Sequence, residues 1–278
     1  MKHILLPIDF SEEAITAAQF AVEFASHSAS DLVLLTVFET PLMPPSSTFV
    51  SREMTEENAE DRMEHTAIER LKAFAQTHIG NRVPTHFAAV EGSPASTIAR
   101  YTREHDIDLV VLGTKGATSW GDRFRGTVSS ELMRKSDVPC LIIPQGVSWN
   151  GLTKWVFATD LRSDETPYFT AFADWGERFG ARLTFLHVHL KGGIEHEPHP
   201  ALDAFLTARS KGDTGQVRLE GDDVQTALDG FIRSQGQHLL ALTTQTHTLL
   251  EQFFHPSLAR HEALHGEVPL LVFHRKHN

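Results

Sequence analysis

The residues best suited to chemistry in this sequence are three glycines spaced Gly-x2-Gly-x9-Gly, namely Gly113, Gly116 and Gly126. A helix start rich in hydroxyl groups follows them directly, as Thr127, Val128, Ser129 and Ser130. Glycine lets the backbone approach a ligand without a Cβ in the way. The N–H groups at a helix start attract an anion, and hydroxyl groups add donors. The pattern therefore predicts a phosphate-binding loop.

Three common phosphate-binding motifs are absent from the chain. It has no GxxxxGK[ST], no GxGxxG after the first apolar run, and no SGGxDS-like loop where Pro7–Ser11 stands. These absences disfavour P-loop nucleotidases, Rossmann dehydrogenases and adenylating synthetases of the pyrophosphatase kind. Asp9 ends the first apolar run, so it should face the same crevice as the glycines if the strands are parallel.

Apolar runs alternate with helical stretches along the whole chain, which is typical of βαβ units and predicts the α/β class. The expected strands of the first half are Lys2–Ile8, Leu32–Phe38, Val83–Val90, Leu109–Leu112 and Cys140–Ile143. The expected helices run from an N-cap at Ser11 to about Ser26 and then over Met54–Gln76, Pro94–Glu104 and Val128–Lys135. These elements are in the order that a doubly wound parallel sheet requires.

The second half of the chain repeats the first. An offset of 151 carries Asp9 to Asp160 and aligns DLVLLTV from Asp31 with RLTFLHV from Arg182. From Leu109 onward the offset is 130, so the second copy lacks most of the loop Thr40–Arg52 and part of the helix after it. We therefore expect two tandem domains, residues 1–147 and 151–278, which meet near Gly146–Gly151.

The spaced glycines with a following threonine, together with the aspartate that ends the first strand, resemble the signature of the universal stress protein family. The resemblance covers the whole chain as a tandem pair. It implies two doubly wound, five-stranded parallel sheets of the adenine nucleotide alpha hydrolase type, each with strand order 3-2-1-4-5. It also implies a stress-response protein that binds ATP, with Mg²⁺ or Mn²⁺ on the phosphate oxygens.

The family's ATP site carries over to matching positions of the first domain. The resemblance places the adenine and ribose against Pro7, Ile8, Asp9 and Val37. It places the ribose and phosphates against Gly113, Gly116, Gly126, Thr127, Val128 and Ser129. The alternative interpretation is that the glycines only shape turns.

The second domain departs from the family pattern. The offset of 130 puts Thr243, Thr246, Pro256 and Ser257 where Gly113, Gly116, Gly126 and Thr127 stand. All three glycines are replaced, and proline removes an N–H where a phosphate needs a donor. Asp160 is retained, but an aspartate by itself can simply cap the next helix. We therefore expect ATP in the first domain and none in the second.

Histidines are the candidate metal ligands. His187 and His189 alternate along a strand, and His261 and His265 are four apart on an expected helix, spacings that suit Zn²⁺ or Ni²⁺. The alternative interpretation is that these histidines are solvated or cap a helix. Cys140, the single cysteine, lies in an apolar run and is expected to be a buried core thiol.

Composition limits the partners. The chain has 278 residues, a net charge of −11 and no apolar run near the ~20 residues of a membrane span. We expect no membrane and no nucleic acid, since those partners favour a basic face. A single cysteine fits a reducing compartment, so we expect the cytoplasm.

Three functions remain open at this point. The first is an ATP-binding signalling module, with no catalytic residue assigned. The second is a slow ATP hydrolase or phosphotransferase in which Asp9 supports a metal-bound phosphate. The third is a scaffold whose second domain binds another ligand, a metal or a protein. For assembly, we expect the apolar edge strands Leu141–Ile143 and Leu270–Phe273 to pair within the chain, and homodimerisation stays possible.

Overall fold

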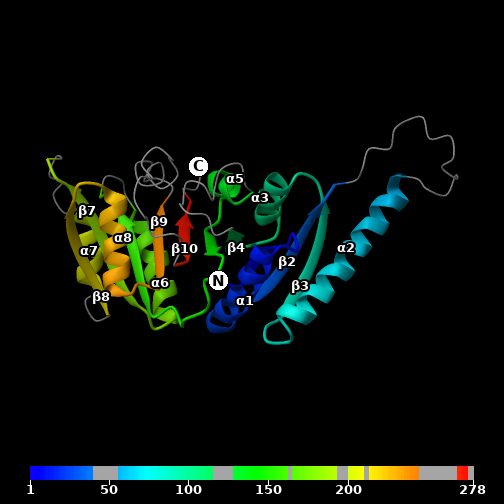
Figure 1. Cartoon of the computed structure of the whole chain (residues 1–278), viewed down its shortest axis with the longest axis horizontal. Coiled ribbons are helices and arrows are strands. Elements are labelled where there is room, and N and C mark those ends of the chain that lie inside the picture. Colours follow the sequence, from blue (N-terminus) through cyan, green and yellow to red (C-terminus); the bar gives the residue numbers. More distant parts are fainter. Residues whose placement is uncertain are drawn as a thin grey trace.

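A ten-stranded sheet with helices on both faces forms the framework of the protein (Figure 1). The computed structural model describes residues 1–39, 56–114, 128–161, 165–192, 200–209, 213–243 and 268–274. In Figure 1, α2 and β3 lie at one end of the sheet, α7 and β8 lie at the other, and β10 is at the middle.

The first half follows the predicted order of elements. Its strands are β1 (His3–Pro7), β2 (Asp31–Phe38), β3 (Thr85–Glu91), β4 (Leu109–Thr114) and β5 (Cys140–Pro144). Its helices are α1 (Glu12–Ser28), α2 (Glu56–His78), α3 (Pro94–Glu104) and α5 (Val128–Lys135). The first and last residues of each helix and strand differ from the predicted ones by two positions or fewer. The Ser11 N-cap is confirmed, since its side chain accepts a hydrogen bond from the N–H of Ala14.

The second half has the same plan with a shorter second helix. Its strands are β6 (Lys154–Thr159), β7 (Arg182–Leu190), β8 (Thr214–Gly221), β9 (Leu239–Thr243) and β10 (Leu270–Phe273). Its described helices are α6 (Thr166–Arg178), α7 (Pro200–Ala208) and α8 (Val224–Gln235). Because α7 has 9 residues and α2 has 23, the expected loss from this part of the second copy is confirmed.

The strand order across the sheet is β3-β2-β1-β4-β5-β10-β9-β6-β7-β8. Each half reads as order 3-2-1-4-5, and the pairs within each half are parallel. The predicted fold class, two doubly wound five-stranded sheets in tandem, is confirmed. Among the helices of the described ranges, none has both the length and the apolar character that a membrane span requires.

Equivalent positions of the two halves behave alike, as a duplication requires. His3 pairs with Asp31 in the first half, and Lys154 pairs with Arg182 in the second. The residue that ends the turn after the first strand of each half, Phe10 or Leu161, has a left-handed φ of 64° or 58°. The offset of 151 therefore holds in three dimensions.

Two apolar layers hold the helices on opposite faces of the sheet. One layer packs α1, α2, α6 and α7 against side chains such as Leu6 and Phe185. The other packs α3, α5 and α8 against side chains such as Leu5 and Leu186. Since successive residues of a strand point to opposite faces, both faces need apolar residues, and this explains the continuous apolar runs of the sequence.

The two halves join where β5 pairs antiparallel with β10. Leu141 is opposite Leu271 and Cys140 is opposite Val272, and these side chains are 0–1% exposed. An unpaired apolar edge strand would attract other strands, so the pairing covers both edges at once. The expected pairing within the chain is confirmed.

Cys140 lies in this seam and is fully buried, as the sequence predicts. Burial away from water raises the pKa of its thiol from 9.0 to about 12. The thiol therefore stays protonated near neutral pH, and a thiol is a poor nucleophile in that form.

Cys140 should react with an alkylating reagent only when the seam opens. At about pH 8 we expect labelling at least about 100-fold slower in the native protein than in denaturant, because β5 is an interior strand. Leu271→Arg, which places a charge opposite Leu141, should speed the labelling while the circular dichroism stays folded.

The control for this prediction is Thr77→Arg, which adds the same charge to the exposed surface of α2 and should leave the labelling rate unchanged. Native wild-type protein that is labelled as fast as the denatured chain would contradict a closed seam.

Candidate functional site

The predicted site residues that the structure describes gather at the carboxyl ends of β1, β2 and β4. Pro7 ends β1 and is followed by Ile8 and Asp9, while Val37 and Gly113 lie near the ends of β2 and β4. The strand order reverses between β1 and β4, and ligands of open α/β sheets bind at such a switch point.

Asp9 is an exposed carboxylate fixed by the turn into α1. Its Oδ1 accepts hydrogen bonds from the backbone N–H of Ser11 at 3.0 Å and from the Ser11 hydroxyl at 2.5 Å. Ser11 in turn caps α1, so the carboxylate is held at the positive end of a helix. The left-handed backbone of Phe10 between them is the kind of strain that often marks a functional turn.

Gly113 is required by a close approach of the backbone. A Cβ on Gly113 would lie 2.1 Å from the carbonyl oxygen of Glu13, in the first turn of α1. We predicted this glycine from access to a ligand, whereas the nearest atoms in the structure belong to α1. The missing side chain thus allows α1 to start directly against the end of β4.

The start of α5 is brought to the same place. Ser129, only 8% exposed, donates its hydroxyl hydrogen to the carbonyl oxygen of Gly113 at 3.4 Å. Val128 beside it is 38% exposed, an unusual position for a large apolar side chain. The first N–H groups of a helix have no partner within the helix itself, so the start of α5 presents N–H groups near the end of β4.

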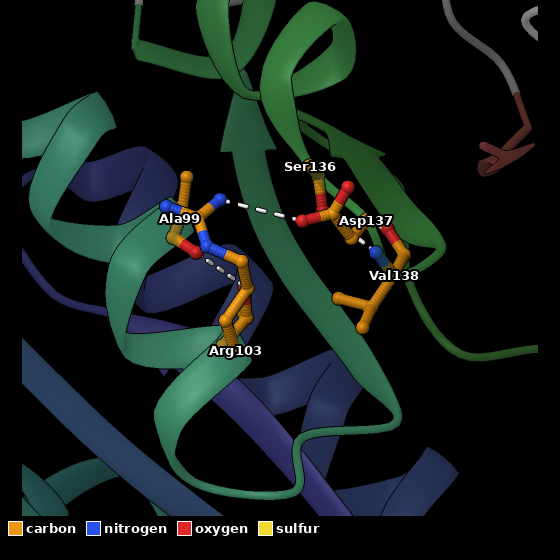
Figure 2. Close-up of polar contacts among 6 residues, drawn as sticks. Ala99, Arg103, Ser136, Asp137 and Val138 are labelled. Atoms are coloured by element: carbon orange, nitrogen blue, oxygen red, sulfur yellow. Dashed lines mark hydrogen bonds and ion pairs between the residues drawn. The ribbon is translucent and has the colours of Figure 1, made fainter. Parts of the chain in front are cut away.

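The other end of α5 is anchored by polar contacts (Figure 2). Figure 2 shows Arg103 of α3 turned toward Asp137, and their Nη1 and Oδ2 atoms are 3.3 Å apart. The Ser136 hydroxyl donates to the carbonyl oxygen of Val138 at 2.7 Å and accepts from its N–H at 3.2 Å. These contacts join α3, the end of α5 and the start of β5.

The remaining predicted residues of the first site lie outside the described residues. They are Gly116, Gly126 and Thr127. The phosphate-binding loop itself therefore stays a prediction, and the structure describes its two ends, Gly113 and the start of α5.

The corresponding place in the second half is bridged by a buried carboxylate. Thr243 stands where Gly113 stands, and its hydroxyl donates to Oε1 of Glu165 at 2.6 Å. Thr159, at the position of Ile8, donates to Oε2 of the same glutamate. Glu165 is 1% exposed and lies between the ends of β6 and β9. These hydrogen bonds tie together the two strand ends at the place where the first half has Ile8 and Gly113.

Sequence reasoning missed Glu165. The available signal was the pair of threonines that replaces Ile8 and Gly113 at the ends of two strands. The helix start also differs, because the offset of 151 carries Glu12 to position 163, whereas α6 begins at Thr166. A helix that began as α1 does would press its backbone against the Thr243 side chain, as the geometry at Gly113 shows.

The structure describes two of the four histidines that we considered as metal ligands. His187 is 5% exposed, and its Nδ1 makes a hydrogen bond of 3.0 Å with the carbonyl oxygen of Thr159. It is therefore a buried strand residue rather than a solvated one, and His189 is half-buried. His261 and His265 lie outside the described residues. Within the described ranges, no three His, Cys, Asp or Glu side chains are grouped as metal ligands.

Comparison with known proteins relates the first half of the chain to a known family. The sequence model of the universal stress protein family matches residues 1–144. A universal stress protein of Methanocaldococcus jannaschii is 25% identical over 147 residues, which are 51% of this chain and 81% of the relative. One of Thermus aquaticus is 29% identical over 143 residues, which are 51% of this chain and 98% of the relative.

A solved structure extends the likeness to the whole chain. A universal stress protein from Archaeoglobus fulgidus superposes over 98% of both chains, with a TM-score of 0.69 and 17% sequence identity. At that identity the superposition shows a shared fold, and the fold includes both halves.

Gly113→Ala should lower the free energy of unfolding by about 1–3 kcal/mol, because the added methyl group overlaps the backbone of Glu13. Chemical denaturation with fluorescence detection measures the change.

Gly215→Ala is the matched control, since an added Cβ on this β8 glycine meets nothing within 4 Å. It should leave the free energy of unfolding close to that of the wild type. Equal destabilisation by both substitutions would show that Gly113 has no special packing role.

Proposed function

We propose a nucleotide-binding function for the first half from one premise: the chain belongs to the universal stress protein family. The proposal is that residues 1–147 bind ATP and that occupancy of the site serves as a signal in a stress response. The observation that carries it is the meeting of Asp9, Gly113 and the start of α5 at the switch point between β1 and β4.

The described residues fit an adenine nucleotide. Half-buried Val37 and buried Ile8 provide apolar surface beside the strand ends for a base. The exposed Asp9 carboxylate is an acceptor suited to ribose hydroxyl groups. The start of α5 offers N–H donors to phosphate oxygens. In this proposal Gly116, Gly126 and Thr127 complete the phosphate contacts, and Mg²⁺ or Mn²⁺ is held by the phosphates.

The second half, residues 151–278, is proposed to be a domain of the same family that has lost this function. The support is the buried Glu165 carboxylate, which accepts hydrogen bonds from Thr159 and Thr243 where the first half has Ile8 and Gly113. These three side chains are bonded to one another at the place that corresponds to the proposed nucleotide site of the first half.

Asp9→Ala should weaken ATP binding about tenfold, the scale of one hydrogen bond to a charged group. Asp160→Ala makes the same change at the equivalent position of the second half and should leave the affinity unchanged. Isothermal titration calorimetry with ATP and Mg²⁺ measures both variants.

The same samples separate binding from hydrolysis. ADP release that Asp9→Ala abolishes would favour the slow hydrolase over the signalling module. If the two aspartate variants lose affinity equally, the assignment of the site to the first half is wrong.

The number of ATP molecules bound per chain is a separate test. We expect a calorimetric stoichiometry of one, because Glu165 and Thr243 occupy the second crevice. Two equivalent sites per chain would overturn the proposed loss in the second half.

A further inference from the structure

A cavity of about 610 Å³ runs along α8 and the β6–β8 face of the sheet, from the amino ends of β6 and β7 to Glu220 near the carboxyl end of β8. Lys154 and Arg182, the first residues of β6 and β7, line it together with Gln237, which follows α8. Its size falls in the range of about 300–1,000 Å³ that small-molecule sites occupy. It belongs to the second half, so it is separate from the proposed nucleotide site.

The walls of this cavity carry both apolar and polar side chains, and the polar ones include Thr184, Ser234 and Gln235. Val217 and Leu219 of β8 face the same side of the sheet as Leu186 of β7, and Phe231 of α8 lies across from them. All three lining side chains are only partly buried, although they pack against the core. An apolar body of a ligand would complete their burial, which is favourable in proportion to the area removed from water.

Two cations stand at the amino ends of the strands. The Lys154 ammonium donates to the carbonyl oxygen of Gln235 at 2.9 Å, at the last turn of α8. Arg182 pairs with Asp213 at 2.8 Å, and the two side chains are 63% and 65% exposed. Such an exposed pair contributes little stability, so the guanidinium can exchange partners readily. Burial and the charge of Lys154 lower the pKa of the neighbouring His238, which leaves the positive charge to the two cations.

Gln237 is the residue of the cavity that most strongly indicates a bound ligand. Its side chain is 8% exposed, and within the described part of the chain its Oε1 has no hydrogen-bond partner. A buried carbonyl oxygen without a donor is destabilising, whereas a ligand hydroxyl or N–H group would satisfy it. Gln237 immediately precedes His238, whose N–H donates to the carbonyl oxygen of Lys154 at 2.8 Å. The unsatisfied amide thus lies beside the cations.

The first half does not have these groups at equivalent positions. Ile107, which is 5% exposed, stands in place of Gln237, and His3 stands in place of Lys154. Asp31 replaces Arg182 and is paired with His86 at 3.3 Å. The buried amide and the two cations are therefore properties of the second half and are not imposed by the fold.

We infer that this cavity is a binding site for a small amphiphile whose head carries an anionic group next to a hydrogen-bond donor. The carboxylate or similar anion contacts Lys154 and Arg182, and the donor contacts Oε1 of Gln237. The tail lies along Val217, Leu219 and Phe231. Glu220 also lines the cavity, but it is near the carboxyl end of β8, and this fixes the anionic head at the other end.

The test uses 2-hydroxyoctanoate as the probe, because it has a carboxylate, an adjacent hydroxyl group and an apolar tail. Octanoate lacks the hydroxyl donor, and 1,2-octanediol lacks the charge. Titrations of the full chain are followed by ¹H–¹⁵N NMR. We expect saturable shifts in α8, Gln237, β8 and the starts of β6 and β7, with 2-hydroxyoctanoate binding about tenfold more tightly than the diol.

Variants assign the contacts. Lys154→Ala and Arg182→Ala should each weaken binding of 2-hydroxyoctanoate several-fold. Gln237→Ile, which introduces the residue of the first half, should remove the preference for 2-hydroxyoctanoate over octanoate. Lys72→Ala, which removes an exposed lysine of α2, is the charge control and should leave the affinity for 2-hydroxyoctanoate unchanged. Thermal melts establish that each variant is folded.

The outcomes are distinct. If no probe gives saturable shifts at a few millimolar, or if the shifts lie outside α8, Gln237, β8 and the starts of β6 and β7, the site does not exist. If the diol binds as tightly as 2-hydroxyoctanoate, the anionic class is wrong. If folded Gln237→Ile keeps the hydroxyl preference, the role of Gln237 is wrong. ATP titration of the same samples is independent of all these results.

Discussion

Strands β5 and β10 pair antiparallel at the middle of the sheet, so each covers the edge that the other half would otherwise expose. Every residue of the two strands is buried, with Leu141 and Leu271 in the apolar layer on one face and Cys140 and Val272 in the layer on the other. Neither half could leave this strand uncovered in water at low cost. Fusing two copies in one chain supplies the partner strand without a second molecule, and the continuous sheet follows from that.

The two halves kept the fold and diverged at their ligand-binding edges. One substitution illustrates the divergence: Gly113 allows α1 to begin against β4, while Thr243 fills that space and donates to the buried Glu165. On the other side of the second half, Gln237, Lys154 and Arg182 replace the pattern of the first half. In the proposed function only the first copy binds a nucleotide, which leaves the second copy free to change.

Much of the fold could be predicted from the sequence, because buried parallel strands are continuous apolar runs and Ser11 is a strong N-cap. The repeat then fixed the second half, and the apolar edges predicted the β5–β10 pairing. The site was harder. The contact between Thr243 and Glu165 joins residues 78 positions apart, so only the comparison with the first copy, and not the local pattern, points to it. The packing reason for a glycine at position 113 likewise depends on an element that is distant in sequence. The same holds for the unsatisfied amide of Gln237.

Hydrogen exchange of the full chain, with and without saturating ATP and Mg²⁺, tests the central claim most directly, because it reports both halves in one sample. A nucleotide site confined to the first half predicts slower exchange in peptides that contain Asp9–Ser11 and Val128–Ser129. It predicts unchanged exchange in peptides that contain Thr159, Glu165 and Thr243. Equal slowing in both halves, or no slowing in the first, would contradict a nucleotide site confined to the first half.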